Sequence, residues 1–215
     1  MTIRAYGVFD EERYFESGDE CPVYTLKGVK VGVNVCEDIW YDAGPTTVQR
    51  AAGAEVIVNI NASPFHAGKR AFREEMIAQR ASEHGLAVAY VNTVGGQDEL
   101  VFDGGSIIYD GDGGLVARGP AFQEHLLVTD LEFGDGPAQR KQAPAHATAD
   151  ALAAVGAPKT LTVSGNASPD KTPLAARPIA AGVDGPEEVY RALVLGTGDY
   201  LRKSGFSGAL IGLSG

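Results

Sequence analysis

The chain has 215 residues, 44% hydrophobic and 21% charged, which is enough apolar material for a packed core in one or two domains. Its net charge of −10 argues against a general nucleic-acid binder or a membrane-surface binder. No apolar run approaches the ~18 residues of a membrane span, and two cysteines make no disulfide framework, so we expect a cytoplasmic protein.

Short β-branched runs alternate with helical patterns in the first half of the chain. We predict strands over 30–35, 54–60 and 86–92, separated by helices over 44–54 and 69–85. The second and third strands are apolar at nearly every position, which predicts burial on both faces. Strand, helix, strand, helix, strand is typical of βαβ units, so the predicted fold class is α/β.

Two more strands are predicted further along, over 106–110 and 125–131. The stretch "YDGDGGL" at 109–115 has the Asp-Gly and Gly-Gly pairs that supply positive φ angles in hairpin turns. A hairpin makes neighbouring strands antiparallel, so the sheet need not be all parallel.

Composition changes after about residue 136. Residues 137–182 are rich in Ala, Pro, Thr and Ser and have almost no aromatics, which predicts a mostly extended or disordered linker. A helix is predicted from Pro186, with apolar Val189, Leu193 and Leu201 on it.

The last ten residues, "FSGALIGLSG", are expected to begin a buried strand that runs into a glycine loop. A globular domain does not end on its first strand. We therefore expect the chain to be a fragment at this end.

The stretch "VNVCEDIW" places Cys36 at the end of a predicted strand, followed at once by Glu37 and Asp38. A cysteine in this position is usually a small core hydrophobe. The carboxyl end of a strand is, however, where α/β sheets place ligands. A reactive thiol needs a neighbouring base or cation, and His66 is the nearest candidate. Cys21 is expected to be an unreactive loop residue.

Polar clusters also follow the next two strands. The first could simply cap the following helix, but three polar loops at neighbouring strand ends favour a site. The members of these clusters are Asn61, Ser63, His66 and Lys69 after the second strand, and Asn92, Gln97, Asp98 and Glu99 after the third.

Four stretches together resemble the glutaminase domain of the glutamine-dependent NAD+ synthetases, within the nitrilase, or carbon–nitrogen hydrolase, superfamily. They are "YGVFDEERYF", "GVNVCEDIW", "NASPFHAGKR" and "YVNTVGGQDELVFDGGS". The terminal "GALIGLSG" is similar to the opening of that family's ATP-binding domain. The resemblance implies part of an α-β-β-α sandwich over 1–136, a flexible linker over 137–185, and the first helix and strand of a Rossmann-like domain over 186–215.

The resemblance also implies a chemistry. Cys36 would be the nucleophile that hydrolyses the glutamine amide, and the ammonia released would amidate deamido-NAD+ in an ATP-dependent reaction. ATP, with Mg²⁺, is implied as a substrate, and neither a resident metal site nor a prosthetic group is expected. The family forms homo-oligomers. Implied site residues are Tyr6, Ser63 and Lys69 for glutamine, and Gly212, Leu213, Ser214 and Gly215 for phosphate.

The general-base Glu and the Lys of the family's catalytic triad would fall before Met1. Because one oxyanion donor is typically worth ~10²–10³ in rate, we expect this chain alone to be nearly inactive. Two other readings stay open: a stand-alone nitrilase-type amidase, which the tail "ALIGLSG" disfavours, and a non-catalytic module that keeps only the fold.

Overall fold

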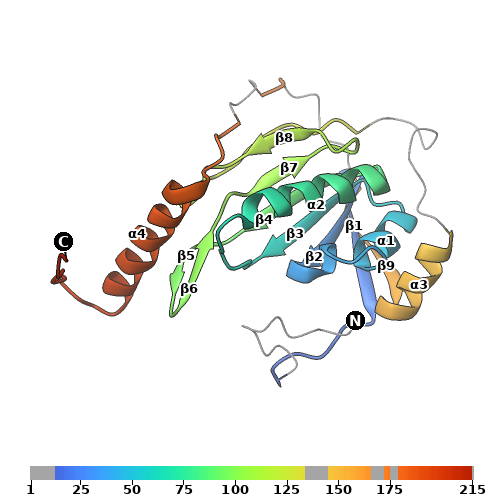
Figure 1. Ribbon diagram of the computed structural model, residues 1–215. Coiled ribbons are helices and arrows are strands. Elements are labelled where there is room, and N and C mark those ends of the chain that lie inside the picture. The colour runs from blue at the N-terminus through green and yellow to red at the C-terminus, as the bar shows by residue number, and fades with distance from the viewer. Residues whose placement is uncertain (1–12, 134–144, 166–171, 175–178, 215) are drawn as a thin grey trace.

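The computed structural model of the protein describes residues 13–133, 145–165, 172–174 and 179–214. Helices and strands alternate through this part of the chain (Figure 1). In chain order the elements are β1 (Glu20–Leu26), β2 (Val29–Val35), the 3-10 helix η2 (Cys36–Ile39), α1 (Pro45–Ala51), β3 (Val56–Asn61), α2 (Lys69–His84), β4 (Ala87–Asn92), β5 (Val94–Gln97), β6 (Leu100–Asp103), β7 (Ile107–Tyr109), β8 (Leu115–Arg118), α3 (Ala145–Val155), β9 (Ala157–Ser164) and α4 (Gly185–Lys203).

A seven-stranded sheet in the order β8-β7-β4-β3-β2-β1-β9 forms the centre of the molecule. Its middle strands β2, β3 and β4 are parallel. The pairs β1–β2, β4–β7 and β7–β8 are antiparallel. β5 and β6 make a separate hairpin. The α/β class and the mixed sheet are therefore confirmed.

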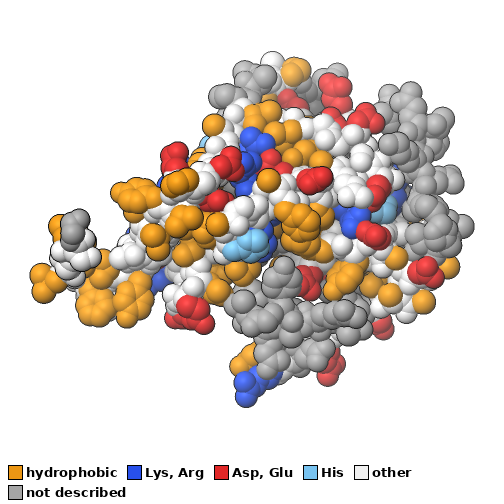
Figure 2. All heavy atoms as spheres, in the orientation of Figure 1, with side chains coloured by type: hydrophobic (Ala, Val, Ile, Leu, Met, Phe, Trp, Pro, Cys, Tyr) orange, Lys and Arg blue, Asp and Glu red, His pale blue; other side chains and the backbone are white. Residues whose placement is uncertain are grey.

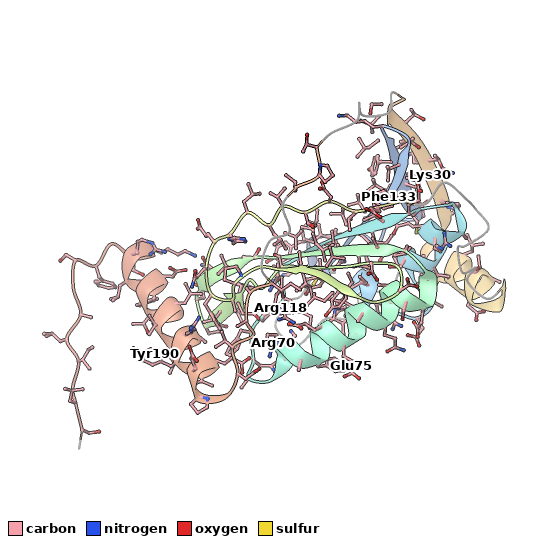
Figure 3. All side chains as sticks on the ribbon, turned by 90° about the horizontal axis from the view of Figure 1, so that it is seen from above. Lys30, Arg70, Glu75, Arg118, Phe133 and Tyr190 are labelled. Carbon is pink, nitrogen blue, oxygen red and sulfur yellow. The ribbon has the colours of Figure 1, made fainter. Side chains whose placement is uncertain are left out.

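Helices cover one face of this sheet, and the hydrophobic core lies beneath them (Figure 3). Ile57 and Val88, from β3 and β4, are fully buried against Ile77 of α2. α2 is also tied to the sheet by charge. Arg70 and Arg118 come from α2 and β8 and lie close together in Figure 3, and each forms an ion pair with Glu74.

The opposite face is open around the carboxyl ends of the parallel strands. Val35, Ile60 and Val91 share this face through direct pairing, and they are 58%, 51% and 47% exposed. The expectation that β3 and β4 are buried on both faces is therefore wrong for the described part of the chain. Of the implied α-β-β-α arrangement, the described residues form one large sheet with a helical layer on one side.

Most of the predicted elements in the first half are confirmed. The three strands are β2, β3 and β4, the two helices are α1 and α2, and "YDGDGGL" joins the antiparallel pair β7 and β8. Gly85 ends α2 in the left-handed conformation, with φ 58°. Cys21, expected in a loop, is instead buried in β1.

Two of the predicted strands do not form. No strand forms over 125–131, and none forms after α4, where Leu210, Ile211 and Leu213 are almost fully exposed. A strand needs a neighbour to accept its hydrogen bonds, and neither segment pairs with a described strand. The helix expected from Pro186 is confirmed as α4.

The expected linker is wrong over residues 145–164, which form α3 and β9. The alanine run of α3 packs on α1, with Ala151 fully buried near Val48. β9 then pairs parallel with β1 through seven residue pairs, at the end of the sheet. Alanine has the highest intrinsic helix propensity, so its abundance here is consistent with order. The proposed domain boundaries stay a prediction.

Within the described residues, no helix is both long enough and apolar enough to cross a bilayer.

Candidate active site

Cys36 lies where β2 ends and η2 begins, at the carboxyl end of the parallel strands. Its φ of 48° is in the left-handed region, which costs a non-glycine residue free energy unless the surroundings hold it there. The residue is half-buried, and its thiol is not in a disulfide. Two hydrogen bonds fix the turn: Asp38 accepts from the Val35 N–H at 2.9 Å, and the Asn59 amide donates to the Cys36 carbonyl at 3.3 Å.

A row of buried asparagines supports this turn from the helix-covered face. Its members are Asn34 of β2, Asn59 and Asn61 of β3, and Asn92 of β4. Asn34 is paired directly with Asn59, and Asn61 is paired directly with Asn92. The Asn59 amide donates to the Asn34 side-chain oxygen at 2.7 Å, and the Asn61 amide donates to the Asn59 side-chain oxygen at 2.6 Å. All four are at most 7% exposed, so their polar groups need partners within the protein. The Asn61 side-chain oxygen has no such partner among the described residues.

A second network continues from Asn92 to the segment that carries Ser63. The Ser63 N–H donates to the Asn92 side-chain oxygen at 2.9 Å, and the Asn92 amide donates to Asp103 at 3.1 Å. Asp103 in turn accepts two hydrogen bonds from the Arg73 guanidinium, at 3.1 and 2.6 Å. Both charged side chains are buried. This bidentate pair therefore anchors the backbone that presents Ser63.

Lys69, the first residue of α2, is 5% exposed. Its ammonium donates to the Pro64 carbonyl at 2.9 Å, which closes the segment between Ser63 and α2. Burial lowers the pKa of Lys69, and the cation of Arg73 lowers it further. The charges of Asp103, Cys36 and Glu37 act in the opposite direction. Lys69 therefore shares the electrostatic environment of Cys36.

Tyr90 of β4 lies beneath this group and is 1% exposed. Burial raises its pKa to about 12, although the nearby cation of Arg73 and the hydroxyl of Ser63 oppose the change. The phenol therefore stays neutral at physiological pH. Its ring stacks with Arg73, whose guanidinium carbon lies 5.7 Å from the ring centre.

The structure brings together some of the predicted site residues and separates others. Asn59 bonds to the Cys36 turn, whereas Ser63 bonds to Asn92 and Lys69 bonds to the Pro64 carbonyl. The charge of Cys36 acts on Lys69, so these residues belong to one part of the molecule. His66, the alternative base, is exposed, and its ring lies within hydrogen-bond distance of the neighbouring Ala67 carbonyl. The loop residues Gln97, Asp98 and Glu99 form the exposed turn of the β5–β6 hairpin.

The residues expected to bind phosphate lie elsewhere. Gly212, Leu213 and Ser214 belong to the exposed tail after α4, on the side of that helix away from β2 and β3 (Figure 1). Tyr6 and Gly215 lie outside the described residues.

Sequence reasoning missed Asn34, Asn59, Arg73, Tyr90 and Asp103. A signal for the asparagines was present, because asparagine is depleted in strands and each interrupts a run of β-branched residues. No local signal pairs Arg73 with Asp103, since they lie thirty positions apart and meet only in the fold.

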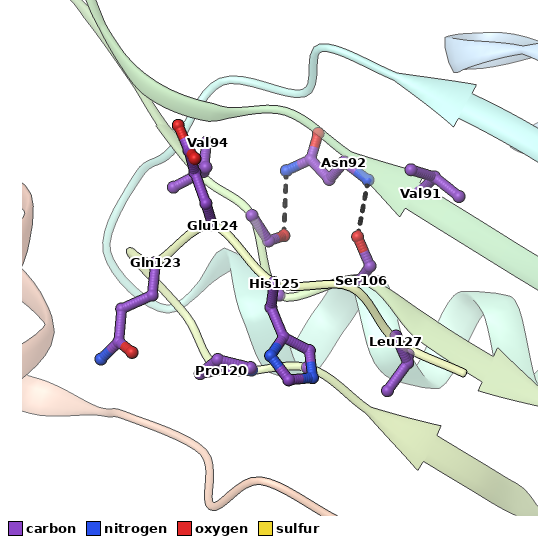
Figure 4. Close-up of a pocket in the computed structure, with 12 residues that line it drawn as sticks. Val91, Asn92, Val94, Ser106, Pro120, Gln123, Glu124, His125 and Leu127 are labelled. Atoms are coloured by element: carbon purple, nitrogen blue, oxygen red, sulfur yellow. Dashed lines mark hydrogen bonds between the residues drawn. The ribbon is translucent and has the colours of Figure 1, made fainter. Parts of the chain in front are cut away.

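A pocket of about 250 Å³ lies on the other side of Asn92, between β4, β7 and the segment after β8. Figure 4 shows Asn92 at its edge, with the backbone N–H bonded to Ser106 and the side-chain amide bonded to the Gly104 carbonyl. His125 and Glu124 also line it, and both are exposed.

The arrangement suits nucleophilic chemistry on a small polar substrate. A half-buried thiol lies in a held, left-handed turn and shares the electrostatic environment of the buried Lys69. Hydrogen bonds with Asn59 and Asn92 fix the surrounding backbone. Among the described residues, no cluster of His, Cys, Asp and Glu could hold a metal ion.

The chain is similar in sequence to proteins of known families. A sequence model of the family described as "Carbon-nitrogen hydrolase" matches residues 3–141. The glutamine-dependent NAD(+) synthetase of Thermotoga maritima is 38% identical over all of this chain and 37% of its own length. That of Aquifex aeolicus is 43% identical over 98% of this chain and 36% of its own. The chain thus spans little more than a third of these curated relatives.

One solved structure is similar over nearly the whole chain. It is a glutamine-dependent NAD+ synthetase from Acinetobacter baumannii in complex with ADP, with a TM-score of 0.72 and 29% identity. The match covers 96% of this chain and 32% of that one.

Proposed function

This chain belongs to the carbon-nitrogen hydrolase family, and from that premise we propose that it provides the cysteine nucleophile of a glutamine-dependent NAD+ synthetase. The observation that supports this most is the position of Cys36. It lies at the carboxyl end of a parallel strand, in a left-handed turn, and its half-buried thiol shares the electrostatic environment of Lys69.

The proposed reaction begins when the Cys36 sulfur attacks the side-chain amide carbon of glutamine. A carbon–sulfur bond forms, the carbon–nitrogen bond breaks, and the nitrogen leaves as ammonia after taking up a proton. Water then attacks the thioester, which releases glutamate and regenerates the thiol. The ammonia would amidate deamido-NAD+ to NAD+ at the expense of ATP, in the complete protein.

Ser63 and Lys69 are proposed to hold glutamine, together with Tyr6. Lys69 supplies a buried positive charge that attracts the negatively charged groups of the substrate more strongly than an exposed cation would. The hydrogen bonds of Lys69 to Pro64 and of Ser63 to Asn92 fix the segment before the substrate arrives.

The glycine-rich tail is proposed to contribute to the phosphate site of the ATP-binding part. Backbone N–H groups of Gly212, Leu213, Ser214 and Gly215 would bind phosphate oxygens there. ATP would arrive with Mg²⁺ as a substrate. The assembly of several copies, which the family resemblance implies, belongs to the same proposal.

Glutamine hydrolysis by the complete gene product, measured as glutamate release, tests the function. We expect turnover that Cys36→Ala abolishes, and NAD+ formation from glutamine that disappears with it. Ammonia supplied directly should restore NAD+ formation in Cys36→Ala, because only the nitrogen source is lost. Turnover that survives Cys36→Ala would reject the assignment of the nucleophile.

The 215-residue chain can be tested without turnover. A chloromethyl ketone built on glutamine should alkylate Cys36 faster than iodoacetamide does, and free glutamine should protect it. Cys21 is an internal reference, because burial raises its pKa to about 11 and leaves its thiol unreactive. Labelling without glutamine protection would favour a module that keeps the fold but not the site.

A further inference from the structure

Helix α4 reaches the candidate site from outside the central sheet. Its Glu188 carboxylate accepts a hydrogen bond from the Gly68 N–H at 3.1 Å. Gly68 is the residue before Lys69 and has a left-handed φ of 80° at the start of α2. The carboxylate is only 4% exposed, so α4 holds the backbone next to Lys69 with a buried charge.

A second contact lies about three turns further along the same helix. The Asp199 carboxylate, also 4% exposed, accepts from the Gly96 N–H at 2.7 Å. The Lys203 ammonium donates to the Gly96 carbonyl at 2.6 Å. A Cβ atom on Gly96 would lie 2.8 Å from the Gly196 Cα, so helix and hairpin approach this closely only because both residues are glycine.

The hairpin that α4 contacts is bonded directly to the site segment. The Phe65 N–H donates to the Val101 carbonyl at 2.7 Å, and Pro64 forms an isolated bridge with Phe102. Asp103, at the end of the same hairpin, leads through Asn92 to Ser63. α4 therefore holds the segment from Ser63 to Lys69 in two ways. It bonds directly to Gly68 near the end of the segment, and it contacts the hairpin that bonds to Pro64 and Phe65 and, through Asn92, to Ser63.

The polarity of α4 is the reverse of an ordinary packed helix. The apolar Val189 and Leu193 are 40% and 64% exposed, whereas Glu188 and Asp199 are buried. Figure 2 shows hydrophobic side chains gathered along α4 and the chain after it. Carboxylates are almost never fully buried unless they are paired. The buried face of α4 is therefore specialised for bonding to the backbone.

We propose that Glu188 is a positioning residue for Lys69, and that α4 fixes the Ser63–Lys69 segment relative to Cys36. The inference rests on the proposed function, because the segment matters through the substrate that it holds. Without the Glu188 contact, Gly68 loses its acceptor and the start of α2 gains freedom. Lys69 then no longer meets the substrate in one fixed place, although the Cys36 thiol itself is unchanged.

The test measures two alkylation rates of Cys36 in the full 215-residue chain. One reagent is the glutamine chloromethyl ketone, which needs the binding segment, and the other is iodoacetamide, which needs only the thiol. We expect Glu188→Ala to lower the ratio of the two rates about tenfold, since a hydrogen bond to a charged group is worth roughly that factor. Glu188→Asp keeps the charge, but its shorter side chain moves the carboxylate oxygens away from the Gly68 N–H. It should therefore lower the ratio as well.

Two variants serve as controls. Glu188→Gln keeps an acceptor oxygen and should restore most of the ratio, whereas Glu187→Ala removes the neighbouring, exposed carboxylate that pairs with Arg191 and should leave the ratio unchanged. Cys21 labelling reports on folding, because this buried thiol reacts only when the structure opens.

The outcomes separate the two proposals. An unchanged ratio in Glu188→Ala and Glu188→Asp, with Cys21 still protected, would overturn the positioning role and leave the proposed function intact. Equal loss of both rates with Cys21 exposed in every Glu188 variant would also overturn it, since the role would then be structural. If glutamine fails to protect Cys36 in the unaltered chain, the proposed function fails first.

Discussion

The two faces of the central sheet have opposite chemistry at the same place. On the helix-covered face, the carboxyl ends of β2, β3 and β4 present buried asparagines. On the other face, the alternate residues Val35, Ile60 and Val91 are about half exposed. Asn59 and Ile60 are consecutive residues of one strand, yet the polar side chain is fully buried and the apolar one is not.

This contrast shows that the strand ends are built around the site and not only around the core. Burying an amide costs free energy unless its hydrogen bonds are made. Asn34, Asn59 and Asn61 bond side chain to side chain, and Asn92 bonds to Asp103 and to the Ser63 N–H. Within this row, as the structure describes it, the Asn61 side-chain oxygen alone lacks a partner. The open face has the opposite character, because it presents contiguous apolar surface, which marks an interaction surface or a liability to aggregate.

The largest expected effect is on the covered face, at the buried ion pair. Arg73→Met leaves the Asp103 carboxylate buried without its cation, which should lower the free energy of unfolding by about 3–5 kcal/mol in urea titrations. Replacing Asp103 by Leu in the same chain should recover part of this loss. Arg191→Met, which breaks an exposed pair, should cost less than about 0.5 kcal/mol. Equal costs for Arg73→Met and Arg191→Met would contradict the anchoring role.

The next effect compares neighbouring residues on the two faces. Asn59→Leu removes the donor to the Asn34 side chain and to the Cys36 carbonyl, and should cost about 2–3 kcal/mol. It should also slow ketone labelling of Cys36, because the left-handed turn loses a support. Ile60→Thr should change stability by less than about 0.5 kcal/mol and leave labelling unchanged. A similar cost at both positions would mean that the asparagine row does not distinguish the faces.

A smaller effect is expected from pH on the covered face. Burial raises the pKa of Tyr90 to about 12 and that of Cys21 to about 11, from ordinary values of 10.0 and 9.0. The folded state then binds more protons than the unfolded state between pH 9 and 12. The stability from these groups is therefore complete below pH 9 and is lost as pH rises through that window.

Tyr90→Phe isolates the tyrosine contribution. The variant should match the unaltered chain near pH 7 and lose roughly 1–2 kcal/mol less between pH 10 and 12. Chemical denaturation at a series of pH values gives the comparison. Parallel curves for the two proteins would show that the phenol is not as enclosed as its surroundings indicate.

The smallest effect on stability is expected on the open face. Replacing Val35, Ile60 and Val91 together by threonine should cost less than about 0.5 kcal/mol at each position, because they are already half exposed. Self-association measured by sedimentation should fall, since the apolar patch is removed. Unchanged sedimentation would show that this face does not drive association of the chain.

Local sequence alone determined the strands and helices that lead to the site. Valine-rich runs, the pattern of α2 with Gly85 behind it, and the Asp-Gly turn gave β2, β3, β4, both helices and the β7–β8 hairpin, because these signals act over a few residues. The motif around Cys36 was also visible. The sequence did not show that Asn59 is buried and Ile60 is exposed. Alternation along a strand places the two side chains on opposite faces of the sheet, but it does not indicate which face helices cover.

Only the tertiary structure decided the long-range contacts and the fate of the weaker segments. Arg73 bonds to Asp103, and Glu188 bonds to Gly68, which lies 120 positions away in the chain. The local sequence around one partner does not indicate the other, so only the fold shows these contacts. Residues 157–164 form β9 because they pair with β1 at the end of the sheet. The apolar residues after α4 pair with no described strand and are exposed. Strand formation is a property of two segments, so one sequence stretch cannot predict it by itself.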